Sequence, residues 1–234
     1  MTTRIEVRRQ CGRSVCTLRD GVLAARRLDA PEGRVRIALV STVALLLAGD
    51  EVRIEVIVGP GVDLELQEIA GTVAYDMRGG SASWSVDVRV EEKGFLAWTA
   101  PPFVVADGAD VVRSTGVTLA AGGRALLRET YVFGRTGQVG GDLLASTTAV
   151  LEDRPLLVEE LDLARAPRSE RAVLDRARCL DSVTFLGGRL AGPQGEVMQL
   201  ERPGSIVRRM ASRAHAADLD ACYLSARGMG TSDR

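Results

Sequence analysis

The sequence has little of the chemistry on which most active sites and metal centres depend. His215 is the only histidine among 234 residues, Lys93 is the only lysine, and asparagine is absent. A metal centre built from several imidazoles is therefore excluded, and a single imidazole is left for any catalytic triad. No serine lies in the G-x-S-x-G pattern of a nucleophile elbow. The residue types present do not predict an enzyme.

Cysteine pairs and long apolar runs are also missing, and no leader segment is expected. The scattered cysteines form no C-x-x-C pair and favour buried, unpaired thiols over a metal site: Cys11, Cys16, Cys179 and Cys222. The start MTTRIEVRRQCGR is charged and lacks the apolar core of a signal peptide. The run from Ile37 to Ala48 is too short to cross a bilayer. These features predict a cytoplasmic location without membrane association.

The charge balance and the glycine-rich segments give no sign of a nucleic acid or nucleotide partner. The net charge is −1, because acidic residues balance an almost purely arginine cation set, so no basic stripe for nucleic acid is expected. Residues 134–141 (GRTGQVGG) resemble a phosphate-binding loop only in glycine content, since the lysine and the following helix are missing. That segment is interpreted as a turn.

The most informative segment present is GDEVRIEVIVGPGVDLEL, residues 49–66. Apolar residues alternate with charged ones before and after Gly59-Pro60-Gly61, which is typical of half-buried strands joined by a turn. The segment therefore predicts two strands folded against each other. The first strand pair is expected in residues 4–20, a helix or loop in residues 21–31, and a buried strand or pair of strands from Val35 to Leu47.

Similar units recur down the chain, and each begins at a glycine turn. Strands are expected at residues 83–90, 95–99, 111–119, 124–133 and 142–152. Repeated rungs of this kind favour strands stacked in successive β-helix-like layers, with a plain β-sandwich as the alternative. A mainly β fold is predicted, with about two helices toward the C-terminal third. Residues 1–228 are expected to form a single domain and residues 229–234 a disordered tail.

The C-terminal third changes character after Pro155. Residues 169–178 (SERAVLDRAR) begin with a capping serine and show helical apolar spacing, and residues 205–217 resemble a basic amphipathic helix. Strands are expected at residues 182–186, 196–200 and 221–225. His215 falls on the polar side of the second predicted helix, which indicates a solvated histidine.

Several motifs in order resemble the UreD (UreH) family of urease accessory proteins, in particular short actinobacterial-type members. They are Leu45–Asp50 (LLLAGD), Val56–Leu66 (VIVGPGVDLEL), Leu96–Phe103 (LAWTAPPF), Ala106–Ala109 (ADGA) and Tyr131–Arg135 (YVFGR). The resemblance covers roughly Val35 to Leu163. The chain departs from the family pattern at Leu66-Gln67-Glu68, at Thr99, and at Asp142, where a glutamate is usual.

The resemblance implies a β-helix-like stack of strands and a non-catalytic role. A member would join UreF-type and UreG-type partners on the urease apoprotein and support nickel insertion, and the complex allows a homodimer of this chain. Nickel would be in transit rather than tightly bound, since tight Ni²⁺ sites prefer imidazole or thiolate ligands. The competing interpretation is a β-sandwich or β-helix module that binds a protein or a carbohydrate. With few aromatic residues, a row of exposed rings for sugar stacking is hard to build.

A hydrated metal ion needs a path lined by oxygen ligands or water. Asp63 and Glu65 share one face of a predicted strand, and Glu68 and Asp76 follow closely, so these carboxylates are candidates for a polar conduit. The alternative is that they face bulk solvent. Arg135 and Asp142, beside the glycine turn that resembles the family's, are candidates for a partner surface.

Overall fold

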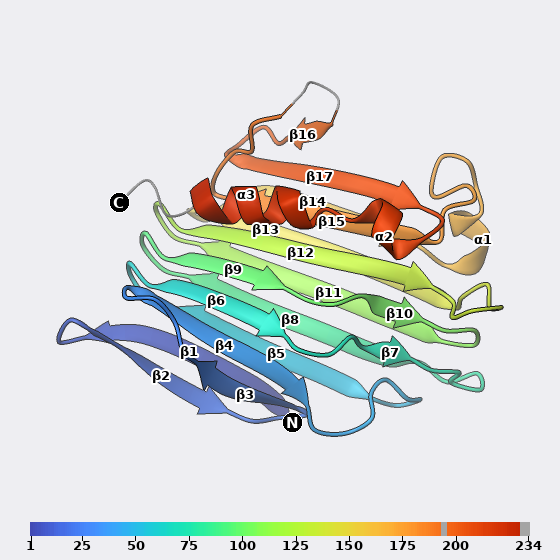
Figure 1. Ribbon diagram of the computed structural model, residues 1–234, viewed down its shortest axis with the longest axis horizontal. Helices are drawn as coiled ribbons and strands as arrows, with labels where there is room; N and C mark the ends of the chain where they lie inside the picture. Colours follow the sequence, from blue (N-terminus) through green and yellow to red (C-terminus); the bar gives the residue numbers. More distant parts are fainter. Residues whose placement is uncertain (193–195, 230–234) are drawn as a thin grey trace.

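Two β-sheets lie face to face in the computed structural model, which describes residues 1–192 and 196–229 (Figure 1). The elements are, in chain order, β1 (Thr2–Gln10), β2 (Arg13–Arg19), β3 (Leu23–Leu28), β4 (Arg34–Ser41), β5 (Glu51–Val58), β6 (Asp63–Glu68), β7 (Val73–Ala74), β8 (Ala82–Val90), β9 (Phe95–Thr99), β10 (Phe103–Val105), β11 (Asp110–Leu119), β12 (Arg124–Phe133), β13 (Asp142–Leu151), β14 (Arg154–Asp162), α1 (Arg165–Arg168), β15 (Cys179–Leu186), β16 (Val197–Gln199), β17 (Gly204–Ala211), α2 (Ala214–Ala217) and α3 (Asp220–Met229). Sheet A has the strand order β14-β13-β11-β8-β5-β1-β2. Sheet B has the order β16-β17-β15-β12-β9-β6-β4-β3, with the short β10 and β7 alongside.

The chain winds between the two sheets in successive coils. From β4 to β13 it crosses from one sheet to the other at almost every turn, and each strand lies parallel to the previous strand of its own sheet. Parallel neighbours require such crossovers, whereas a sandwich made of hairpins has antiparallel neighbours. The predicted mainly β fold with stacked layers and helices toward the C-terminus is confirmed. Antiparallel pairs such as β1–β2 and β13–β14 close the ends of the stack.

The prediction that residues 49–66 fold back as a hairpin is wrong. β5 and β6 are both present, but β5 pairs with β1 and β8 in sheet A, while β6 pairs with β4 and β9 in sheet B. Alternating apolar residues on both sides of a Gly-Pro-Gly turn fit either arrangement, because the apolar faces of the two strands can meet across the core instead of side by side. The turn at Gly59–Gly61 therefore carries the chain from one sheet to the other.

The glycine turns stack on one another at one end of the coils. Gly94 lies under the first turn, and a Cβ atom there would be 3.1 Å from the Gly59 carbonyl oxygen. The Gly94 carbonyl in turn accepts a hydrogen bond from the N–H of Arg124 at 3.0 Å. Glycine recurs at these turns because backbone approaches backbone too closely for a side chain.

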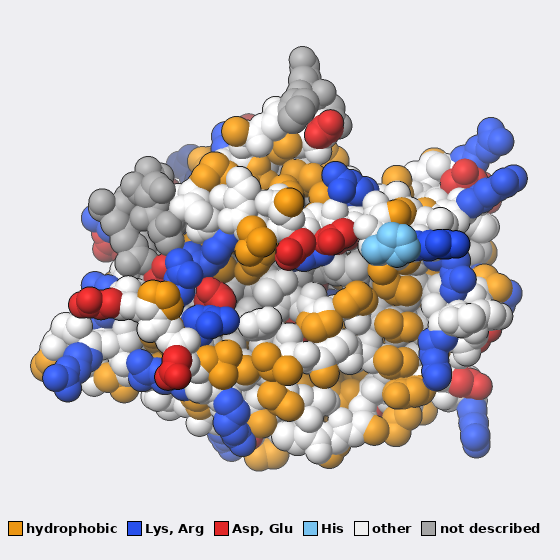
Figure 2. All heavy atoms as spheres, viewed as in Figure 1, with side chains coloured by type: hydrophobic (Ala, Val, Ile, Leu, Met, Phe, Trp, Pro, Cys, Tyr) orange, Lys and Arg blue, Asp and Glu red, His pale blue; other side chains and the backbone are white. Residues whose placement is uncertain are grey.

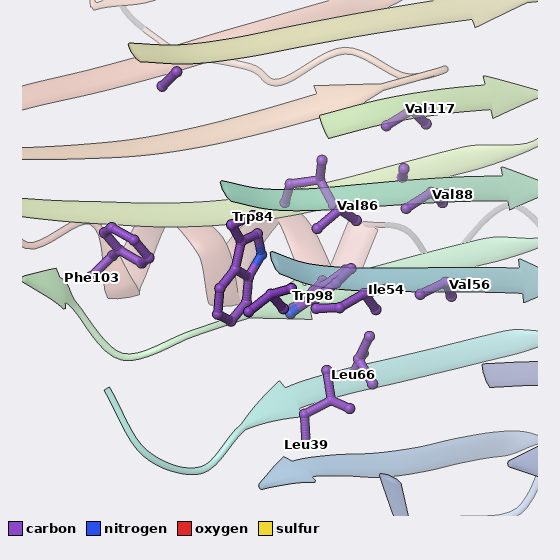
Figure 3. Packing of buried hydrophobic residues seen from close by; sticks show 14 of the residues in the cluster. Leu39, Ile54, Val56, Leu66, Trp84, Val86, Val88, Trp98, Phe103 and Val117 are labelled. Carbon is purple, nitrogen blue, oxygen red and sulfur yellow. The ribbon is translucent and has the colours of Figure 1, made fainter. Parts of the chain in front are cut away.

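The core fills the space between the sheets. Inward-facing residues of both sheets, such as Ile54, Trp84 and Leu66, pack against one another with at most 1% of their surface exposed (Figure 3). A second apolar cluster lies on the outer face of sheet B, where α3 covers Phe95 and Leu126. Figure 1 shows α2 and α3 on this side of the molecule.

Four local predictions are wrong, although the C-terminal location of the helices is right. Residues 21–31 contain β3, residues 169–178 form turns after α1, residues 205–217 begin with β17, and residues 221–225 lie in α3. β17 pairs with β15 over its whole length, so tertiary pairing overrides a weak helical pattern. Met229 ends α3, and the rest of the predicted tail, residues 230–234, lies outside the described residues.

Candidate functional site

Three charged side chains point into the space between the sheets. Side chains at alternate positions of β6, β11 and β12 face inward, as those of Leu66, Val111 and Leu127 do. Two residues further along each strand, the inward positions are occupied by Glu68, Arg113 and Glu129. Arg113 of sheet A reaches across to Glu129 of sheet B, with its Nε and Nη2 atoms 3.1 and 2.9 Å from Oε1. The two sheets are therefore joined by an ion pair whose arginine is buried and whose glutamate side chain is 24% exposed.

Aromatic rings enclose this ion pair. The Arg113 guanidinium lies 5.1 Å from the ring centroids of both Trp84 and Phe103, within the range of a cation–π contact. Trp98 donates its indole N–H to Glu68 at 3.2 Å. Glu68 and Arg113 are 8% and 7% exposed, so both charged groups have lost nearly all contact with solvent.

Burial changes the acidity of Glu68. Loss of solvent raises the pKa of its carboxyl group to about 7, although the Arg113 charge and the Trp98 hydrogen bond act in the opposite direction. Burial likewise raises the pKa of the Tyr131 hydroxyl, which lies on the same inward face of β12 as Glu129. Glu68 is thus poised to gain or lose a proton near neutral pH.

The polar residues continue from the interior to the edge of the sheets. Glu129, Ser182 and Arg208 occupy one row across β12, β15 and β17. Arg208 donates to Ser182 Oγ at 3.3 Å and forms an ion pair with Glu159 of β14 in sheet A. We call the whole line the polar seam, defined by Glu68, Arg113, Glu129, Tyr131, Ser182, Arg208 and Glu159.

Two small cavities lie along the buried part of the polar seam. One, of about 20 Å³, is lined by residues including Glu68, Trp98 and Arg113, and the other, of about 10 Å³, also touches Tyr131. A cavity needs roughly 10–15 Å³ to hold one water molecule. Each therefore has room for about one water and not for a metal ion with its full hydration shell.

The four predicted conduit residues do not lie together. Asp63 and Glu65 face outward from sheet B, beneath α3, whereas Glu68 faces inward and belongs to the polar seam. Asp63 binds Arg227 of α3 at 2.6 Å, and Glu65 binds Arg36 at 3.0 Å. Asp76 is exposed in the loop after β7, where it accepts the N–H of Arg78 at 2.9 Å.

The two predicted partner-surface residues lie at one end of the molecule. Arg135 is exposed in the loop after β12, and its carbonyl accepts a hydrogen bond from Arg178 at 3.1 Å. Asp142 begins β13 and accepts the N–H of Arg165 at 2.5 Å. Both residues are available on the surface, and Asp142 also fixes the start of α1.

Most members of the polar seam cannot be found by looking for charged residues that are close together in the sequence, because they come from different coils. A usable signal was nevertheless present. Arg113 interrupts the inward apolar phase of VVRSTGVTL, and Glu129 interrupts that of RALLRETYVF. A charge in the buried phase of a strand must find a partner across the core. These residues are identified by their inward position in the alternation of each strand, not by being close to one another in the sequence.

Other features of the described residues place limits on further sites. No group of three or more histidine, cysteine, aspartate or glutamate side chains is arranged to hold a metal ion in residues 1–192 and 196–229. No helix in the same residues has the length and apolar character needed to cross a membrane. A groove of about 540 Å³ on the outer face of sheet A is lined by residues such as Ser85, Asp87 and Gly116, and no aromatic ring lines its described part.

Comparison with known proteins identifies the family. A family model described as UreD urease accessory protein matches residues 2–233. Urease accessory protein UreD 1 of Streptomyces griseus is 46% identical over 200 residues, which cover 85% of this chain and 78% of that protein. The UreD proteins of Parafrankia sp. and the UreD 3 of S. griseus are each 31% identical, over 86% and 83% of this chain and 79% and 82% of their own lengths. The chain belongs to the UreD family of urease accessory proteins.

Proposed function

We propose that this protein is a non-catalytic scaffold that assembles with UreF-type and UreG-type partners on the urease apoprotein and supports nickel delivery to it. The family is one of accessory proteins rather than enzymes. The proposed setting is the cytoplasm, and nickel is cargo rather than a resident cofactor. The observation that carries the proposal is the polar seam, a line of carboxylates and hydroxyls that runs from the buried Glu68 to the sheet edge.

The polar seam offers oxygen ligands in a layer that is otherwise apolar. A divalent ion can leave water only where carboxylate or hydroxyl oxygens replace its hydration shell. Since the cavities hold about one water each, passage requires the Arg113–Glu129 ion pair to open and its carboxylate to turn toward the ion. Glu68 becomes a ligand once it loses its proton.

An apolar strip on the outer face of sheet B supports a scaffold role. Val73, Val104 and Val132 lie side by side on β7, β10 and β12, each half-buried, and Tyr75 next to them is 39% exposed. Figure 2 shows hydrophobic side chains gathered over this part of the molecule, below α2. An exposed apolar area of this kind is typical of a protein-binding surface. The carbohydrate-binding alternative finds less support, because no aromatic ring lines the described part of the groove on sheet A.

The test separates assembly from activation. Glu68→Gln and Glu129→Gln remove carboxylates from the polar seam, and Glu51→Gln removes one that pairs with Arg53 on the outer face of sheet A. We expect all three variants to co-purify with the partner proteins and urease. Urease activation in the two seam variants should fall by about tenfold, the scale of losing a supporting ligand group, while Glu51→Gln stays normal.

Two results would contradict the proposal. Normal urease activation by both seam variants would show that these two carboxylates are not needed for nickel delivery. If activation is lost only when the complex is also lost, the two carboxylates are needed for assembly and not for delivery.

A further inference from the structure

A pocket of about 370 Å³ lies beside α1, at the end of the molecule opposite the stacked glycine turns. We call it the arginine pocket and define it by Arg165, Arg168, Arg176 and Arg178 together with Gln138 and Ser169. Asp175 is the only carboxylate among the described residues that line it. Four guanidinium groups line the pocket against one carboxylate, and Asp142 and Asp107 lie near Arg168 without lining it, so the cations still outnumber these carboxylates.

Two of these arginines are held in place by neutral acceptors. Arg168 is 5% exposed, donates to the carbonyls of Gly140, Gly141 and Leu163, and lies 4.1 Å from the ring centroid of Phe133. Burial lowers the pKa of its guanidinium, although the group remains a cation. Its side-chain hydrogen bonds go to carbonyl groups rather than to carboxylates, although the charges of Asp142 and Asp107 also act on it.

Arg178 is fixed in the same way from the other side. Its Nε and Nη2 atoms donate to the carbonyls of Phe133, Gly134 and Arg135 at 2.9 to 3.1 Å. These bonds tie the start of β15 to the loop after β12. The inner wall of the pocket is thus rigid and positively charged before any ligand arrives.

The remaining two arginines are free to move toward a ligand. Arg165 and Arg176 are exposed, and the part of the chain that the structure describes provides no side-chain hydrogen bond or ion pair for either. Guanidinium groups bind phosphate and carboxylate oxygens in pairs of parallel hydrogen bonds. Figure 2 shows basic side chains gathered along this end of the molecule.

We propose that the arginine pocket binds a small polyanion, either a phosphate-bearing molecule or a di- or tricarboxylate. The volume is that of a small-molecule site, and the excess of cations calls for a ligand with at least two negative charges. Arg168 and Arg178 supply a fixed positive wall, and Arg165 and Arg176 close on the anion from solvent. The side-chain NH₂ group of Gln138 adds a neutral donor, whereas the Ser169 hydroxyl already donates to the Ala166 carbonyl. Nothing in the polar seam is required for this binding.

Isothermal titration calorimetry of the full chain with pyrophosphate, citrate and acetate tests the proposal. We expect pyrophosphate or citrate to bind at one site per chain, at least tenfold more tightly than acetate, and more weakly as salt is raised. The stronger of the two identifies the phosphate or the carboxylate class. The double variant Arg165→Gln/Arg176→Gln should bind about tenfold or more weakly, since a hydrogen bond to a charged group contributes on the order of tenfold to an equilibrium constant.

The variant is designed to fold, because the side chains it changes have no described partner. The control is Arg89→Gln, which removes an exposed cation from the outer face of sheet A and should bind as the native chain does. The proposal is overturned if neither polyanion binds, if acetate binds as well, or if both variants lose affinity equally.

Discussion

Glu68 is the residue whose charge depends most directly on the packing around it. Its carboxyl group lies between the sheets, where Trp98 donates to it and Arg113 lies nearby. The balance of burial against these contacts leaves the pKa close to neutrality rather than far above or below it. A small change in the contacts of Glu68, such as movement of the Arg113 side chain, would change its protonation and thereby its capacity to bind a cation.

The first prediction concerns the pH dependence that Glu68 gives to stability. Its pKa is about 7 in the folded chain against an ordinary value of 4.5, so the folded state retains a proton that the unfolded state has lost. Stability from this group is complete below pH 4.5, falls as the pH rises to 7, and changes no further above that. Glu68→Gln should therefore lose less stability than the native chain between pH 5 and 8, by about 2 kcal/mol.

Urea unfolding at several pH values measures this difference. Glu51→Gln, which alters an exposed carboxylate, serves as the control and should follow the native curve. Parallel curves for Glu68→Gln and the native chain would show that Glu68 is ionised in the folded state. The same variant is useful for the activation test, since a loss of activation could not then be ascribed to instability above neutral pH.

At the scale of single elements, sequence patterns predicted strands well and their partners poorly. The alternation in β5, β6, β8 and β11 is produced by each strand's own burial, so it can be found locally. The pairing of β5 with β1 and of β6 with β9 depends on which sheet the chain enters after a turn, and Gly59-Pro60-Gly61 permits both routes. Arg113 and Glu129 occupy inward positions of β11 and β12, but they were not among the residues selected from the sequence.

The helices were predicted poorly because their positions depend on contacts with distant parts of the chain. Residues 205–217 resemble a helix because apolar residues come early and arginines later in the segment. β17 nevertheless lies between β16 and β15 and pairs with β15 over its whole length, and this pairing decides the outcome. α3 was missed because its amphipathic face is short and depends on what lies beneath it, including Asp63 of β6. Contacts between segments far apart in the chain carry this information, and no local window contains it.

The second prediction is that one buried ion pair holds α3 on sheet B. Arg227 binds Asp63 at 2.6 Å, with exposed side-chain fractions of 8% and 4%, and its guanidinium lies 4.8 Å from the Phe95 ring centroid. Arg227→Ala removes this close ion pair from the buried Asp63, and the ion pair of Asp63 with Arg34 is longer, at 3.6 Å. We expect a loss of about 2–4 kcal/mol in the free energy of unfolding and faster amide exchange across α3.

Arg53→Ala provides the matched control, because Arg53 pairs with Glu51 on the surface with more than half of each side chain exposed. It should change stability by less than about 0.5 kcal/mol. Equal effects of the two substitutions on stability, or unchanged amide-exchange protection of α3 in Arg227→Ala, would contradict the prediction. Either result would mean that this ion pair does not hold α3 on sheet B.

At the scale of the whole molecule, the features proposed for function lie in separate regions. The polar seam lies between the sheets, the apolar strip lies on the outer face of sheet B, and the arginine pocket lies at the α1 end. A stack of coils makes this separation natural, since each coil contributes one inward row and one outward row of side chains. Substitutions in one region can therefore be made without disturbing the others.

The third prediction concerns nickel and the isolated chain. Tight Ni²⁺ sites use imidazole or thiolate ligands, and this chain has one histidine, His215, which is exposed on α2. The four cysteines are unpaired, and burial raises the pKa of the Cys16, Cys179 and Cys222 thiols, which keeps them protonated at neutral pH. The polar seam supplies carboxylates, but its cavities are too small for a hydrated ion. We therefore expect the protein alone to bind Ni²⁺ only weakly, and to carry it only when partners open the seam.

Equilibrium dialysis with the native chain, a cysteine-alkylated sample and His215→Ala measures the affinity for Ni²⁺. Stoichiometric, sub-micromolar binding that survives both alkylation and His215→Ala would mean that oxygen ligands alone form a closed site. That result would contradict the proposal that this chain is a path for nickel rather than a store.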